Sequence, residues 1–262
     1  MEFLIHILAG AAVGFAIGVT GVGGGSLMTP LLLMFNYPVP VAIGTDLLYA
    51  AITKSGGAWS HHRRHNVNWR VVFLLAAGSL PVSILVHLLV LQRLLAENHD
   101  YSGVLTFSLG IMLIVTSLIL IFREPLRRRA QSDQPSPVMD FIHRHQTPAT
   151  VIMGMLLGVC VTLSSVGAGA FGAAVLLVIY SQSATVRIVG TDIAHAVPLT
   201  LIAGLGYLFA GFVDYTLLIS LLIGSLPAIH LGSRLSNAVP EKVLQRILIV
   251  LLLGLGVRYA IL

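Results

Sequence analysis

Two aspartates occupy matching positions in the two halves of the chain. Asp46 ends an Ile-Gly-Thr-Asp run, and Asp192 ends a Val-Gly-Thr-Asp run 146 residues later. A carboxylate inside an apolar segment is costly, so it is by default a candidate functional group. Two roles stay open for each. It either caps free N–H groups at the start of its helix, beside Thr45 or Thr191, or binds a proton in a transport cycle.

A lysine and a histidine accompany these aspartates. Lys54 lies eight residues after Asp46, about two helical turns on, and therefore on nearly the same face. It either neutralises Asp46 or attracts an anion. His195 lies three residues after Asp192, a spacing that allows a hydrogen bond on a helix. The pair either relays protons, or His195 is a buried histidine with its hydrogen bonds satisfied.

Breaks rich in glycine and serine precede both aspartates. The first contains Gly21, Gly23, Gly24, Gly25 and Ser26, and the second contains Ser164, Ser165, Gly167 and Gly169. Backbone released from a helix inside a bilayer must line a cavity or be buried in protein. A helix that starts after such a break points free N–H groups and its positive dipole end at the cavity. We therefore expect a small-anion site between the breaks; close helix packing through small residues is the alternative.

Motifs for other chemistry are absent from the sequence. His61, His62 and His65 alternate with arginines and have no carboxylate or cysteine nearby, so we expect neither a metal nor a cofactor. No Ser-His-Asp order, HExxH or CxxC motif indicates an enzyme. A passive anion channel and an intramembrane enzyme that uses Asp192 and His195 remain alternatives to a transporter.

The elements that position these residues must lie in a membrane. The chain is 56% hydrophobic and 10% charged, with a mean hydropathy of +0.94, whereas a soluble domain carries roughly 25% charged residues. The net charge of +5 does not indicate nucleic-acid binding, because the arginines sit in short loops between apolar runs. A single cysteine, Cys160, excludes an intramolecular disulfide. We predict an all-α polytopic membrane protein.

Ten apolar stretches divide the chain. Eight are long (3–20, 41–60, 69–92, 101–122, 149–163, 187–213, 215–233 and 243–262), and two are short (26–36 and 170–181). A spanning helix needs about 20 residues, so the short stretches are expected to be broken or re-entrant helices, giving eight to ten membrane segments. The polar, arginine-rich segment 123–147 separates a first membrane repeat (1–122) from a second (148–262).

The two halves are diverged copies of one unit. Residues 43–81 and 189–227 align without a gap and share ten identities, including the Gly-Ser-Leu-Pro runs that end both segments. If all ten stretches cross, the copies are inverted, and the arginine distribution places both termini outside and the segment 123–147 in the cytoplasm. If the short stretches re-enter, the copies are parallel with four spans each. We favour inversion.

The motifs also resemble a known family. The runs GVGGGSLMTPLLL, AIGTDLLYAAITKSGGAWSHHRR, TLSSVGAGAFG and RIVGTDIAHAVPLTLIAGLG are similar to those of the TauE/SafE family of sulfite exporter-like permeases. The resemblance implies a multi-pass bacterial inner (plasma) membrane transporter for sulfite, thiosulfate or organosulfonates, with eight spans from a four-span duplication. It places the family's GxGGG motif on Gly21, Gly23, Gly24 and Gly25, and its altered second copy on Ser165, Gly167 and Gly169.

The expected function is secondary transport of a small anion, coupled to protons or driven by the membrane potential. The expected partners are that anion and the lipid bilayer, and no nucleic acid. The sequence leaves the oligomeric state open, with a homodimer among the options.

Overall fold

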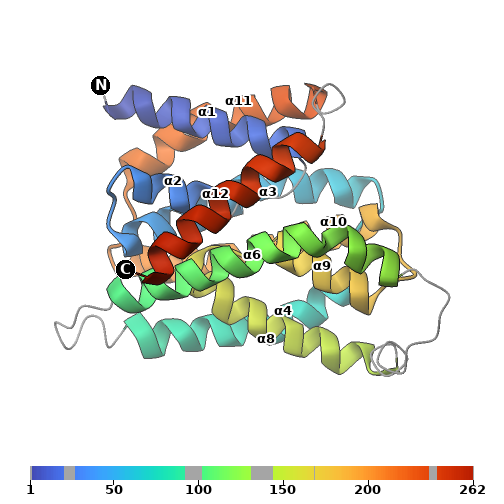
Figure 1. The fold of residues 1–262 in the computed structure, drawn as a ribbon. Helices are drawn as coiled ribbons and strands as arrows, with labels where there is room; N and C mark the ends of the chain where they lie inside the picture. The colour runs from blue at the N-terminus through green and yellow to red at the C-terminus, as the bar shows by residue number, and fades with distance from the viewer. Residues whose placement is uncertain are drawn as a thin grey trace.

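Apolar helices build the whole described part of the protein, as the composition predicts. The computed structural model describes residues 2–20, 27–91, 102–130, 144–167, 169–235 and 241–261, and these contain helices and short connections but no strand (Figure 1). The helices are α1 (Glu2–Thr20), α2 (Met28–Met34), α3 (Val39–Arg63), α4 (Trp69–Val86), η1 (His87–Leu91), α6 (Ser102–Ala130), α8 (Gln146–Ser164), α9 (Ala170–Ile179), α10 (Thr185–Phe209), α11 (Tyr215–Leu235) and α12 (Glu241–Ile261). The prediction of an all-α polytopic membrane protein is confirmed.

Five of the described helices are long and apolar enough to cross a membrane. The segments are Trp69–Leu89, Leu105–Phe122, Gln146–Ser164, Thr185–Phe209 and Tyr215–Ser233, with shorter apolar helices at Phe3–Val19 and Ile249–Ala260. Large apolar side chains such as Phe73 (68% exposed) and Phe209 (86% exposed) cover the outside of the bundle, where lipid is their solvent. The 25-residue α3 is not among the five, and it carries both Asp46 and Lys54 on its buried face.

The helices of the two halves match one another in position. Both α3 and α10 have 25 residues and begin 146 residues apart, and α4 and α11 begin at the same spacing. Both α1 and α8 have 19 residues and begin 144 residues apart. The turns after α3 and α10 also match, since His65 (φ 56°) and Gly211 (φ 79°) are both left-handed. The apolar span of α6 ends at Phe122, but the helix itself continues to Ala130, into the segment 123–147, of which 131–143 lie outside the described residues.

The halves are interlocked through glycines. Helix α1 packs along α11 and, equivalently, α8 packs along α4. A methyl group added at Gly14 would lie 2.6 Å from Ser225 Cα, and one added at Gly158 would lie 2.6 Å from Ser79 O. These two contacts are equivalent in the two halves. Neither position has room for a side chain, so glycine is what lets the helix backbones touch.

Equivalent helices run in opposite directions. Gly44, near the start of α3, packs on Tyr207, near the end of α10, while Gly204 packs on Leu48. The α6–α12 pair is also antiparallel, because Gly110 contacts Ala260. Copies whose equivalent helices are antiparallel are related by an axis perpendicular to the helices. These contacts favour inverted over parallel halves.

The short helices return the chain to the end at which the preceding long helix began. Tyr37, just after α2, hydrogen-bonds His6 Nε2 at 3.1 Å, and Tyr180, just after α9, hydrogen-bonds Thr150 at 2.8 Å. His6 lies 14 residues before the end of α1, or about 21 Å at 1.5 Å per residue. The start of α1 and Tyr37, which follows α2, therefore lie at the same end of the bundle. Figure 1 shows both chain termini at this end.

Candidate functional site

The second glycine-serine break lies in the middle of the bundle and has an irregular backbone. Helix α8 ends at Ser164, and Ser165, Gly167 and Gly169 follow with φ values of 57°, 119° and 137°. Left-handed values such as these favour glycine, which explains two of the three residue types. Residues Gly21, Gly23, Gly24, Gly25 and Ser26 of the first break lie outside the described residues.

The two serines of this break differ in their bonding. Ser164 Oγ donates to the carbonyl of Cys160 at 2.6 Å and accepts from the N–H of Val166 at 3.2 Å, so it closes the helix end. Ser165 is 1% exposed, and its hydroxyl has no hydrogen bond of normal geometry. It faces the carboxylate of Asp46. Ser165 is therefore the serine of this break whose hydroxyl is directed at a carboxylate of the other half.

The threonines beside the aspartates hold the two halves together. Thr45 Oγ1 accepts a hydrogen bond from the N–H of Asp214 (3.3 Å), and Thr191 Oγ1 accepts one from the N–H of Asn68 (2.9 Å). Asn68 and Asp214 are the residues just before α4 and α11. Each threonine thus satisfies a backbone donor of the opposite half at a helix start. These hydrogen bonds join the helix that carries each aspartate to the opposite half.

Asp46 does not cap its own helix, which corrects one of the two predicted roles. Helix α3 begins at Val39, seven residues earlier. The fully buried Asp46 Oδ2 instead accepts hydrogen bonds from the N–H (3.1 Å) and the hydroxyl of Thr29 at the start of α2. The capping interpretation failed because Asp46 lies about two turns inside the helix, whereas a capping residue must stand just before its first turn.

Asp192 occupies the corresponding position in the other half. It lies within α10, which begins at Thr185, and its Oδ1 is packed directly against Gly172 in the first turn of α9. Asp192 is 2% exposed, and Oδ1 has no hydrogen-bond partner. Both carboxylates therefore sit beside the start of a short helix, where negative charge is favourable. An anionic ligand at either helix start would have to displace or neutralise a carboxylate.

Lys54 interacts electrostatically with both buried carboxylates. It is 6% exposed on α3 and interacts with Asp192 and, less strongly, with Asp46. The predicted neutralisation of Asp46 thus extends across the interface between the halves to Asp192. Thr200 stands at the equivalent position in α10, so the described part of the centre holds one ammonium group against two carboxylates. A buried charge requires such pairing, because an uncompensated one is strongly destabilising.

His195 pairs with a serine of the first half, not with Asp192. Its Nε2 lies 2.8 Å from Ser79 Oγ, while its Nδ1 has no partner. The Asp192–His195 hydrogen bond that the spacing allows is not formed in this structure, because the imidazole of α10 turns towards α4. The missing Nδ1 contact also leaves Ser79 and His195 without the orienting carboxylate of a catalytic triad.

The equivalent pair in the other half is Tyr49 and Ser225. Both are buried and face each other, but neither hydroxyl makes a hydrogen bond of normal geometry. Sequence reasoning missed Thr29, Ser79, Tyr49 and Ser225 as members of the site. The serines could have been found, because both stand in the repeated Gly-Ser-Leu-Pro run; nothing in the sequence singles out Thr29.

The arrangement is a polar centre between the halves, formed by Asp46, Lys54, Ser165, Asp192 and His195 with their partners. Among the described residues no group of three or more histidine, cysteine, aspartate or glutamate side chains could hold a metal ion. Four of the named residues carry a buried atom without a hydrogen-bond partner: Asp46 Oδ1, Ser165 Oγ, Asp192 Oδ1 and His195 Nδ1. Buried polar atoms are normally paired, so such a concentration indicates a place for a polar ligand or water.

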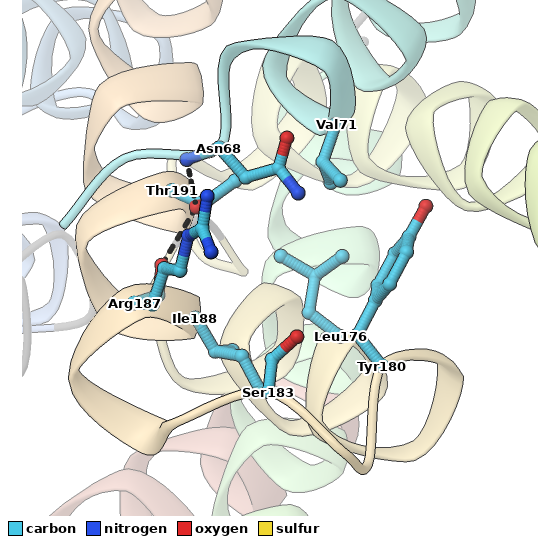
Figure 2. A pocket seen from close by; sticks show the side chains of 8 residues that line it. All are labelled: Asn68, Val71, Leu176, Tyr180, Ser183, Arg187, Ile188 and Thr191. Atoms are coloured by element: carbon cyan, nitrogen blue, oxygen red, sulfur yellow. Dashed lines mark hydrogen bonds between the residues drawn. The ribbon is translucent and has the colours of Figure 1, made fainter. Parts of the chain in front are cut away.

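A separate small pocket lies at the end of the bundle where α10 begins. Figure 2 shows Arg187, Asn68 and Thr191 on one wall and Tyr180 on the other. Its volume is about 10 Å³, which is close to the minimum for one water molecule. The Thr191 hydroxyl bridges Asn68 N and Arg187 O there. This pocket is too small for a polyatomic anion, although it places Arg187 beside the end of α9.

Comparisons with known proteins agree with this architecture. The chain is 35% identical over 254 residues to the probable membrane transporter protein YjnA of Bacillus subtilis, covering 96% of this chain and 97% of the relative. It is 29% identical to the probable membrane transporter protein YdhB of the same organism, covering 92% and 94%. The probable membrane transporter protein MJ0441 of Methanocaldococcus jannaschii is 25% identical, covering 97% and 94%. No solved structure matches the chain significantly.

The family comparison covers nearly the whole molecule. Residues 6–259 match the model of the family described as sulfite exporter TauE/SafE. The match includes both breaks, both aspartates and every long helix described above. It agrees with the resemblance carried by the glycine-rich and Gly-Thr-Asp motifs. The chain belongs to the sulfite exporter TauE/SafE family of membrane transporters.

Proposed function

We propose that this protein is a secondary transporter of the bacterial inner membrane that carries a small sulfur-containing oxyanion or organosulfonate through the polar centre between its halves. The observation that carries the proposal is the set of buried, unpaired polar atoms on Ser165, His195 and the two aspartates, gathered around Lys54. A substrate oxyanion would accept hydrogen bonds from the hydroxyl and charge stabilisation from the ammonium group. The family name and the names of the relatives support transport of this class.

The charges of the centre favour coupling to protons. With Asp46 and Asp192 ionised, Lys54 leaves one negative charge in excess among these three groups, and an anion would be repelled. Protonation of one carboxylate brings the net charge of the three groups to zero. It also frees the backbone N–H groups at the start of the short helix beside that carboxylate. In this cycle a proton and the anion occupy the centre together and leave together. The protein would then be a proton–anion symporter.

Inverted halves can adopt two equivalent conformations, as such a transport cycle requires. Alternating access in inverted repeats arises when the halves exchange conformations around a fixed site. Here α3 and α10 cross at the centre and carry the charged groups, while the Thr45 and Thr191 hydrogen bonds join each to the opposite half. A small shift of these helices would open the centre to one end or to the other.

Counterflow in proteoliposomes tests the proposal. Vesicles loaded with unlabelled sulfite, thiosulfate, sulfoacetate or taurine should accumulate the labelled compound transiently and saturably for at least one of the anions. An inward proton gradient should accelerate uptake, and a protonophore should abolish that acceleration. Absence of saturable exchange of every anion by correctly folded protein would exclude the proposal.

The same vesicles distinguish the alternatives. Flux that rises linearly with concentration and shows no counterflow would indicate a passive channel. A chemically altered product in the vesicle lumen would indicate an enzyme, and His195→Ala would then abolish conversion. Exchange that is saturable but independent of the proton gradient would retain the transporter and exclude the symport mechanism.

A further inference from the structure

A groove opens on the lipid-facing side of the bundle where α3, α4 and α10 meet. Its volume is about 610 Å³, within the range of ~300–1,000 Å³ that is typical of small-ligand sites. The walls include Trp59, Trp69, Phe73, Val72, Val197 and Pro198. The lining is almost entirely apolar, and the groove is separate from the polar centre of the transport site. Its chemistry suits a hydrocarbon chain.

Aromatic rings form one continuous wall of this groove. His62 stands between Trp59 and Trp69, with ring-centroid distances of 6.1 Å and 5.4 Å, and Trp69 lies 6.2 Å from Phe73. Trp69 Nε1 donates a hydrogen bond to His62 Nδ1 at 3.3 Å. Tryptophan rings are enriched where a bilayer's acyl chains meet its headgroups. The wall therefore runs from the headgroup level into the hydrocarbon.

Positive charge lies at the headgroup end of the wall. The Arg63 guanidinium stacks over the Trp59 ring, 5.0 Å from its centroid. Arg64 follows in the α3–α4 turn, Arg70 lies in the first turn of α4, and residues 61–70 contain no carboxylate. The stacking fixes the plane of a group that binds phosphate in a bidentate manner. The charge of this rim is complementary to an acidic headgroup.

The other half of the protein lacks these features. At the equivalent positions, 146 residues later, Leu205 replaces Trp59, Phe209 replaces Arg63 and Ala210 replaces Arg64. The duplicated fold would supply the same helix junction in both leaflets, but only one junction combines an aromatic wall with basic residues. If both junctions only faced lipid, one of them would not need the aromatic wall and the basic residues that the other lacks.

We propose that the groove is a binding site for one anionic phospholipid of the leaflet at this end of the bundle. An acyl chain lies along Trp69, Phe73 and Pro198, and the phosphate contacts Arg63 with Arg64 nearby. The floor of the groove includes Ala194 and Val197 of α10, the helix that carries Asp192 and His195. A bound lipid would therefore pack directly on one of the two central helices.

Tryptophan fluorescence can test this site selectively. The chain has two tryptophans, and both line the groove. The protein is reconstituted in phosphatidylcholine vesicles that contain equal mole fractions of brominated phosphatidylglycerol or brominated phosphatidylcholine. We expect stronger quenching by the anionic lipid, with a preference of roughly fivefold per engaged arginine. The preference should fall as salt is raised.

Variants separate a specific site from the general charge of the protein. In Arg63→Gln with Arg64→Gln the ratio of quenching by the two lipids should fall to about one, as expected for loss of the charge attraction. Arg258→Gln, in the last turn of α12 at the other end of the bundle, should keep the wild-type ratio. Using the ratio within each variant removes any change in intrinsic Trp59 fluorescence. Thermal unfolding of each variant verifies its folding.

Three results would overturn the proposal. Equal quenching by the two lipids in the wild type would mean that the groove is ordinary lipid-facing surface. Absence of quenching by both would mean that protein, such as a second copy of the chain, covers the groove. A preference that survives the double Arg63 and Arg64 substitution would place the anionic lipid elsewhere.

Discussion

At the scale of single residues, Ser165 combines an unfavourable backbone with an unused hydroxyl. Its φ of 57° costs a non-glycine residue about 1–2 kcal/mol relative to glycine. Its Oγ is buried without a partner and faces Asp46. The first half has glycine at the matching position, Gly21. The side chain thus reduces stability where it stands, and we attribute its presence to substrate binding.

Ser165→Gly should therefore separate stability from function. We expect unfolding at the same or a higher temperature, because the left-handed strain is relieved. We expect the KM for transport to rise roughly tenfold or more, as for the loss of one hydrogen bond to a charged group. Melting of the purified protein and counterflow kinetics measure the two effects. Ser165→Ala is the control, since it removes the hydroxyl, keeps the strain and should show only the transport defect; an unchanged KM in both variants would remove Ser165 from the site.

Lys54 permits a second test at this scale. Lys54→Met leaves both carboxylates without their cation and should destabilise the protein by about 3–5 kcal/mol. Adding Asp192→Asn should recover most of that loss, because it removes the carboxylate with which Lys54 interacts more strongly. Adding Asp46→Asn should recover less. Thermal unfolding of the wild type and the three variants completes the comparison. Equal recovery by the two asparagine variants would contradict the stronger interaction of Lys54 with Asp192.

At the scale of helices, close approach of backbones determines the packing. Gly158→Ala should destabilise the protein, because the added methyl group would lie 2.6 Å from the carbonyl of Ser79 and push α8 away from α4. Gly254→Ala is the matched control within α12. No heavy atom lies within 4 Å of its added methyl group, so the substitution should be neutral or stabilise by up to about 1 kcal/mol. Melting temperatures of the two variants check the difference, and a neutral Gly158→Ala would show that the α4–α8 contact is looser than described.

The helices could be predicted from the sequence more completely than their contacts. Apolar run length placed all ten stretches within a few residues of the observed helices, because a bilayer requires continuous apolar segments. The exception is the end of α6, which continues to Ala130 although its apolar span ends at Phe122, because polar residues can extend a helix beyond the bilayer. The contacts that Asp46 and His195 make were not predicted. Both depend on side chains of the other helices, Thr29 and Ser79, and periodicity along one helix carries no information about its partner.

At the scale of the whole molecule, the two halves are interlocked. Helix α1 packs on α11 of the second half and α8 packs on α4 of the first, so these long helices have their main partners in the opposite half. The polar centre likewise takes Asp46 and Lys54 from one half and Ser165, Asp192 and His195 from the other. The copies also differ there: Lys54 matches Thr200, and Tyr49 matches His195. The duplication accounts for the symmetric arrangement of the helices, and these substitutions make the proposed substrate path asymmetric.

The relative orientation of the halves gives a prediction for the intact protein in cells. In inverted halves the connections after α2 and α9 lie on opposite sides of the membrane, whereas in parallel halves with re-entrant short helices they lie on the same side. The contacts of Tyr37 with His6 and of Tyr180 with Thr150 support the first arrangement.

Cysteine labelling in whole cells tests this orientation. A Cys160→Ala background removes the single native cysteine, and Tyr37→Cys and Ser183→Cys are then introduced one at a time. An impermeant maleimide added to whole cells should label position 37 and not position 183, and it should label both after the membrane is permeabilised. Labelling of both or of neither in intact cells would require parallel halves, and the glycine contacts between α3 and α10 would then have to be reinterpreted.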